Sequence, residues 1–251
     1  MAQRTSKRIR RQLQRQAEII KKRKLSATSD SAGKSNSTGK SGYKTAPKAE
    51  VLPDRMPIPT RNKNNELVFK DHPEFRPNLT PKEVLNLGSF GGTYFRRIRS
   101  SVTNETYSGV YKEFPKDWFE NLDIKKQVTS AKYQTTVNRY KVKCGGDLHM
   151  WESSGWISNI DPYGWFQWYC RFYLGRRSTD DDRQIKRGLG VCGPKGRFRN
   201  QLIGRCARNG KKFDDSSVSP VIRQALQHWG YQLTKKDADA YVRKKKLPKL
   251  P

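Results

Sequence analysis

The segment from Tyr163 to Leu174 reads YGWFQWYCRFYL and restricts the fold more than any other part of the sequence. Seven of its twelve residues are aromatic, and only Gln167 and Arg171 form a polar strip. A helix that is apolar nearly all round lies at the centre of a core. We therefore expect a central core helix, with Asp161-Pro162 as its cap and first turn and Gly175 as its stop.

Two kinds of element are expected before this helix. Thr80-Pro81-Lys82-Glu83 has the residues of a helix start, with an N-cap Thr, a Pro in the first turn and a carboxylate three residues after the cap, and Gly88 ends that helix. The stretch from Gly91 to Phe114, with a turn at Asn104, predicts one β-hairpin. Trp118-Phe119 is typical of a short helical anchor.

Four more helices are expected after the aromatic segment. The first spans Asp180 to Arg187 and stops at Gly188, and the second runs from about Gly196 to Arg208. The third runs from the cap Ser219 to Gly230, and the fourth starts from a capping box at Thr234 and ends in a basic run. These elements predict an α+β fold, a small β-hairpin region followed by a mainly helical C-terminal half.

The N-terminal region differs from the rest in composition. Ser, Gly, Lys, Thr and Pro dominate residues 25–59, which can bury little apolar surface. We expect residues 1–58 to form a disordered basic tail and residues 59–251 to form a single globular domain with a basic C-terminal end. The clusters Lys7–Arg11 and Lys21–Lys24 resemble a bipartite nuclear-import signal, with a basic helix lying on a phosphate backbone as the alternative.

The charge of the chain points to a polyanionic partner. There are 52 Lys and Arg against 23 Asp and Glu, a net charge of +29. Such a field attracts polyanions, and nucleic acid is the commonest of these for a basic soluble chain. No apolar run is long enough to cross a membrane, and no apolar segment follows the basic N-terminus, so neither a membrane partner nor a signal peptide is expected.

The function predicted from these features is non-catalytic binding of nucleic acid, with DNA slightly favoured over RNA and with Lys and Arg on the phosphate backbone. We predict no catalytic residue, metal ligand or small-molecule cofactor, and a location in the nucleus, or in a virion if the protein is viral. The oligomeric state stays open. The alternatives are a metal-dependent enzyme acting on nucleic acid, using Asp180–Asp182 or His149, and a basic structural protein of a ribosome or virion.

The candidate binding surface is the helix expected over residues 196–208 and the loop before it. Arg197, Arg205 and Arg208 fall on one helical face, and a helix N-terminus near Gly196 attracts anions. A solvated stripe paired with Asp180–Asp182 is the alternative. The candidate nucleic-acid-binding residues are Lys195, Arg197, Arg199, Arg205, Arg208, Lys211 and Lys212. The last two helices resemble a helix-turn-helix pair, with a plain helical hairpin as the alternative.

The glycine motif near residue 190 and the four cysteines do not predict a cofactor or metal site. The run GLGVCG at 188–193 matches G-x-G-x-x-G, but a dinucleotide site needs a strand before it, and here a charged helix is expected. We interpret these glycines as a flexible connection. The cysteines contain no C-x-x-C pair, so we expect reduced thiols rather than a zinc site. They are Cys144, Cys170, Cys192 and Cys206.

Four runs of the sequence resemble one family. They are LGSFGGTYFR (87–96), CGGDLHMWESSGWI (144–157), DPYGWFQWYCRFYLGRR (161–177) and SPVIRQALQHWGYQL (219–233). Over residues 80–243 the chain is similar to an uncharacterised family of fungi, algae and large DNA viruses. The resemblance implies a single domain from Thr80 onward, and it implies no activity and no catalytic residues.

Overall fold

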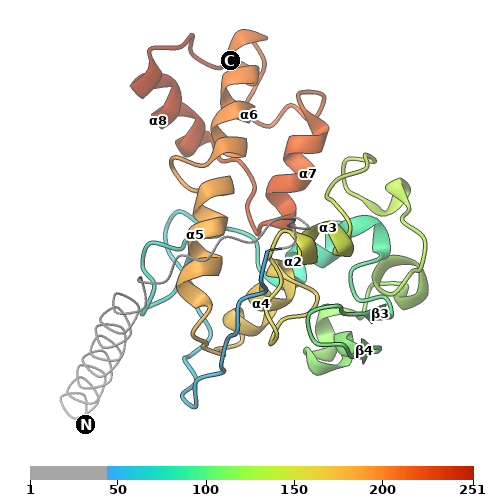
Figure 1. Ribbon diagram of the computed structural model, residues 1–251. Helices are drawn as coiled ribbons and strands as arrows, with labels where there is room; N and C mark the ends of the chain where they lie inside the picture. Colours follow the sequence, from blue (N-terminus) through green and yellow to red (C-terminus); the bar gives the residue numbers. More distant parts are fainter. Residues whose placement is uncertain (1–43) are drawn as a thin grey trace, which may run out of the picture. The chain divides into compact units, whose positions relative to one another are not determined.

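The computed structural model describes residues 44–251, and it has the α+β fold expected from the sequence (Figure 1). This part of the chain contains seven α-helices and two small antiparallel hairpins. The basic clusters Lys7–Arg11 and Lys21–Lys24, and most of the predicted tail, lie outside the described residues. Between residues 44 and 251, no helix is both long and apolar enough to span a bilayer.

The strands are short and pair locally. The hairpin expected between Gly91 and Phe114 is confirmed, since β3 (Ile98–Arg99) pairs with β4 (Thr106–Tyr107) around Asn104, whose φ is 61°. A second hairpin, which the sequence did not indicate, joins β1 (Thr60–Arg61) to β2 (Leu67–Val68).

The helices follow the predicted order. The capping box of α2 (Pro81–Asn86) is formed as expected, because Glu83 N donates to Thr80 Oγ1 and Thr80 N donates to the Glu83 carboxylate. The later helices are α3 (Leu148–Ser153), α4 (Trp165–Tyr173), α5 (Asp181–Cys192), α6 (Arg197–Arg208), α7 (Pro220–His228) and α8 (Lys235–Lys245). Short 3₁₀ turns cover Phe90–Gly92, Val110–Glu113, Lys116–Trp118 and Thr135–Val137, and a π turn covers Ile124–Val128.

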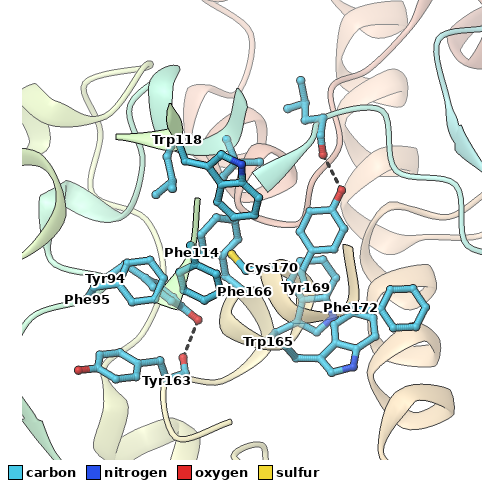
Figure 2. Close-up of a cluster of buried hydrophobic side chains, with 14 of the residues drawn as sticks. Tyr94, Phe95, Phe114, Trp118, Tyr163, Trp165, Phe166, Tyr169, Cys170 and Phe172 are labelled. Carbon is cyan, nitrogen blue, oxygen red and sulfur yellow. Dashed lines mark hydrogen bonds between the residues drawn. The ribbon is translucent and has the colours of Figure 1, made fainter. Parts of the chain in front are cut away.

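Helix α4 is the buried centre of the fold, as its aromatic content predicts. Seven of its nine residues are buried, and Trp168, Tyr169, Cys170 and Phe172 have no exposed surface. Figure 2 shows the rings of this helix packed among aromatic side chains of other segments. Buried Tyr and Trp polar atoms need partners. The Tyr169 hydroxyl donates to Leu79 O at 2.6 Å, and Trp168 Nε1 donates to Asp181 Oδ1 at 2.8 Å.

The start of α4 differs from the prediction. Gly164, with φ 85°, precedes the first helical residue, and Asp161 does not cap the helix. Instead the fully buried Asp161 carboxylate accepts two hydrogen bonds from Arg176, at 2.8 and 2.6 Å, and one from Arg171 at 3.0 Å. The residue that local sequence rules assign to a cap is the centre of a buried ion-pair cluster.

Helix α5 does not stop at Gly188, contrary to the prediction. It continues to Cys192, so the GLGVCG run is mostly helical and is not a flexible connection. A Cβ on Gly188 would lie 3.3 Å from the Trp165 ring and 3.4 Å from the Phe75 ring. The glycine is therefore a close-packing position, at which α5 approaches the rings that surround α4.

The buried apolar side chains form two clusters. The first surrounds α4 and extends from Leu67 to Ile185. The second extends from Cys192 to Val242, and in it α6 packs against both α7 and α8 (Figure 1). Trp229, immediately after α7, packs against both clusters. The two clusters are thus joined through α5 and Trp229.

The domain begins before residue 59, which corrects the predicted boundary. Within residues 44–58, Leu52 N donates to Arg177 O at 2.8 Å and Met56 N donates to Gly175 O at 2.9 Å. Ala49 is buried, and its N–H donates to Asn159 Oδ1. The strap donates these bonds from its backbone N–H groups, which the composition of the segment does not reveal. We call residues 44–58 the N-terminal strap.

Candidate functional site

A cavity of about 760 Å³ lies where the two hydrophobic clusters meet. Small-molecule sites have volumes of about 300–1,000 Å³. Its walls come from the turn at Phe90, the segment 143–151 that includes the first part of α3, the first turn of α4, the second half of α5, the first turn of α6, and α7. Segments far apart in the sequence therefore build one concave site.

Apolar side chains are exposed at this cavity to an unusual degree. Met150, Trp156 and Val221, which are 37%, 41% and 50% exposed, all line it. Only two other large apolar residues in the described chain, Val51 and Ile58, are as open to solvent. Exposed apolar surface that gathers in one place marks a binding site more often than a chance surface.

The side chain of Arg187 is fixed at the wall of the cavity between two indole rings. Its guanidinium carbon lies 5.3 Å from the centre of the Trp156 ring and 5.6 Å from that of Trp229. The guanidinium donates to Trp156 O at 3.2 Å and to Gln184 Oε1 at 2.9 Å. Burial lowers the pKa of Arg187 to about 10, so the group remains cationic at neutral pH.

Three more cations line the same cavity, namely Arg96, Lys143 and Arg197. Within residues 44–251, neither these three side chains nor that of Arg187 forms an ion pair with a carboxylate. The only carboxylate among the lining residues is that of Asp147, which caps α3. The cavity therefore carries an excess of positive charge that the rest of the described chain leaves uncompensated.

His228 supplies a neutral polar group to the cavity. Its ring is stacked on Phe90 with the ring centres 4.0 Å apart, and its Nε2 accepts from Phe90 N–H at 3.0 Å. Burial lowers the pKa of His228 to about 3, so the ring is uncharged at neutral pH. Because Nε2 is an acceptor, the proton is on Nδ1, and no described residue accepts a hydrogen bond from that atom.

The predicted binding residues fall into two groups. Arg197, Arg205 and Arg208 are exposed on α6, as are Lys195 before the helix and Lys212 after it. Of all the predicted residues, the cavity includes Arg197 alone. The Arg205 guanidinium donates to Ser219 Oγ at 2.9 Å.

The other two predicted residues have carboxylate partners. Arg199 forms an ion pair with Asp237 at 2.8 Å and is only 12% exposed, so it belongs to the packing of α6 against α8. Lys211 lies 3.9 Å from Asp215 on an exposed surface. Asp237 is turned toward Arg199, although its backbone N–H donates to the Thr234 hydroxyl as the predicted capping box requires.

The acidic run Asp180–Asp182 is not paired with the arginines of α6, contrary to the alternative weighed for that surface. Asp180 pairs with Arg183. Asp181 accepts from Trp168 Nε1 and from Ser178, and burial raises its pKa. Across residues 44–251, no group of three His, Cys, Asp or Glu side chains is placed to hold a metal ion. The four cysteines are free, and the one at the cavity is Cys144.

Sequence reasoning missed Trp156, Arg187, His228 and Trp229 as site residues. Arg187 was expected at the end of a helix, and Trp229 on an apolar helix face. Their spacing carries no signal, since they meet only after α5 and α7 have packed. Neither a family model, nor a curated protein, nor a solved structure matches this chain, so the site is interpreted from its own chemistry.

Proposed function

We propose that the protein binds nucleic acid without acting on it chemically, and that the cavity and the exposed face of α6 form the contact surface. One observation carries the proposal: four cations line an aromatic cavity, and none of them is paired within the described chain. Phosphate groups are the ligands that unpaired Arg and Lys side chains favour. The remaining charge of the chain adds long-range attraction for any polyanion.

The α6 face extends this surface beyond the cavity. Arg205 and Arg208 are exposed on the same helix as Arg197, and Gly196 lies at the N-cap position without a side-chain cap. The backbone N–H groups of residues 197–199 donate to no group of residues 44–251, so they remain open to an anion. A strand whose phosphates followed this face would meet the cavity at Arg197.

The test compares two triple variants that remove equal charge. Arg96, Lys143 and Arg197 are changed to Gln in the first, and Lys244, Lys245 and Lys246, exposed near the end of α8, in the second. Binding of a labelled single strand and a labelled duplex is measured by fluorescence anisotropy between 50 and 200 mM salt. The slope of log affinity against log salt falls by about 2–3 in the first variant, because each phosphate contact contributes about 0.7–0.9.

The second variant reports on diffuse attraction alone, and its slope is expected to change by less than about 1. Equal changes in both variants would mean that binding has no defined surface. A flat salt response of the wild type would exclude the electrostatic proposal altogether. Incubation of the same strands with Mg²⁺ or Mn²⁺ tests the enzyme alternative, and cleavage that Asp181→Asn abolishes would replace the proposal by that alternative.

A further inference from the structure

We propose that the cavity holds a single unstacked nucleobase, with the adjoining phosphates of its strand on Arg197 and the exposed face of α6. This inference rests on the proposed function and names the part of a nucleic acid that the site recognises. The ligand class is a pyrimidine or purine base carried on a sugar phosphate. The source to which we commit is a single strand, or a nucleotide extruded from a duplex.

The lining of the cavity fits a flat aromatic ligand. Single-stranded nucleic acids bind proteins by stacking their bases on aromatic side chains and on guanidinium planes. Trp156 presents 41% of its surface to solvent at the cavity, and Trp165 and Trp229 lie among its other walls. The guanidinium of Arg187 is held between the rings of Trp156 and Trp229, so the position of its charge is fixed before a ligand arrives.

The charge of the lining fits a ligand that is also anionic. A neutral apolar ligand would cover Arg187 and leave its charge without a partner, which is costly for a half-buried cation. A base attached to a phosphate satisfies both parts of the site at once. Lys143 and Arg197 are exposed at the cavity, where they can reach a phosphate while the base lies deeper.

His228 gives the site one fixed hydrogen-bond donor. The residue is 7% exposed, lines the cavity, and has an Nδ1–H that no described residue accepts. The Nε2–Phe90 hydrogen bond and the stacking on Phe90 fix the ring, and therefore the direction of that donor. Every base presents ring-nitrogen or carbonyl acceptors on its edge. A donor on a cavity-lining side chain that has no acceptor within residues 44–251 is the feature that a base edge would complete.

The shape of the site excludes a stacked duplex. The walls come from α3, α4, α5, α6 and α7, so the space is bounded on several sides and holds about 760 Å³. A duplex presents its bases only as edges in a groove, and an enclosed pocket reaches a whole base only after that base has left the stack. Outside the cavity, Arg205 and Arg208 are exposed on the same helix as Arg197 and offer cations to the phosphates of the rest of the strand.

The experiment separates the base from the backbone. Two labelled single-stranded DNA 12-mers of equal charge are compared at fixed salt, one with bases throughout and one with an abasic sugar at every position. We expect the strand with bases to bind about tenfold or more tightly, because stacking of one base contributes that much. Trp156→Ala and Val221→Trp should each reduce the ratio of the two affinities, with bases against abasic, toward one, and this ratio is the readout whatever happens to the absolute affinity.

Ile58→Trp is the matched control for Val221→Trp. Both positions carry exposed aliphatic residues, at 56% and 50%, but Ile58 lies outside the cavity, so the preference for bases should persist. Equal binding of the two wild-type strands, with a steep salt response, would overturn the base inference and leave the proposed function standing. Failure of both strands to bind would overturn the two together.

A last arm distinguishes a strand from a free nucleotide. Thymidine monophosphate is titrated while the tryptophan fluorescence of the full chain is followed. We expect it to bind at least about a hundredfold more weakly than the 12-mer, since it cannot contact the α6 face. Binding as tight as that of the 12-mer would make the cavity a site for free nucleotides and would overturn the commitment to a strand.

Discussion

Replacing Asp161 tests whether this residue is a helix cap or the centre of a buried ion-pair cluster. Its carboxylate is fully buried and accepts three hydrogen bonds from Arg176 and Arg171 at 2.6–3.0 Å. Asp161→Asn removes the charge that pairs with Arg176, whereas Arg171 keeps its ion pair with Glu113. Breaking a buried pair on one side costs about 3–5 kcal/mol of unfolding free energy. For a domain of this size, that lowers Tm by about 6–20 °C.

The comparison with Asp161→Ser makes the result decisive. Asn, Ser and Asp are nearly equal as N-cap residues, so a cap would leave both variants within about 1 kcal/mol of the wild type. An ion-pair cluster predicts a large loss in both. Thermal and urea unfolding, followed by circular dichroism, measure the change. Two variants as stable as the wild type would refute the ion-pair reasoning and restore the cap.

Three further predictions concern packing, the N-terminal strap and pH. Gly188→Val should lower Tm, because the new side chain would meet the packed rings of Phe75 and Trp165. Gly190→Ala should instead stabilise α5 by about 0.5–1 kcal/mol, because a Cβ there meets nothing within 4 Å. Calorimetry on both variants measures these opposite changes. Removing residues 1–58 should destabilise the domain more than removing residues 1–43, because only the longer deletion removes the strap. Equal thermal unfolding midpoints of the two deletion variants would show that the strap contributes nothing to stability. Below pH 6.5 His228 binds a proton in the unfolded chain but not in the folded protein, where burial lowers its pKa to about 3. The free energy of unfolding should therefore fall by up to about 1.4 kcal/mol for each pH unit between 6.5 and 3. His228→Gln should reduce that slope.

The sequence predicts those elements whose cause is local. The aromatic density of residues 163–174 requires burial wherever the segment lies, and α4 is buried. The Thr80 capping box and the turn at Asn104 depend on residues a few positions apart, and both form as expected. The exposed arginines of α6 follow from its helical period in the same way.

The predictions that were wrong concern residues whose partners lie far along the chain. Local rules predict a helix stop at Gly188, but the rings of Phe75 and Trp165 pack against this glycine and α5 continues past it. Asp161 has the local sequence of a helix cap, but its carboxylate accepts hydrogen bonds from Arg171 and Arg176 instead. The strap is held by backbone hydrogen bonds to Gly175 and Arg177, which the composition of the segment does not reveal.

The cavity was beyond prediction for the same reason. Phe90, Trp156, Arg187 and His228 belong to four separate segments, and no spacing brings them together. A cavity also depends on space that side chains leave unfilled, which composition does not encode. What the sequence indicated correctly is the exposure of Arg197 near the start of a helix, where the cavity and the α6 face meet.

The two hydrophobic clusters follow one another along the chain, and this order bears on how the protein is made. Buried residues of the first cluster end at Ile185, and those of the second begin at Cys192. During synthesis the earlier part of a chain folds before the later part has emerged. Most of the rings around core helix α4 can therefore pack while α7 is still being translated. Until Trp229 leaves the ribosome, Phe90 lacks the His228 ring that stacks on it and Trp165 lacks the Trp229 ring 4.4 Å away, so the nascent chain passes through a stage with open aromatic surface.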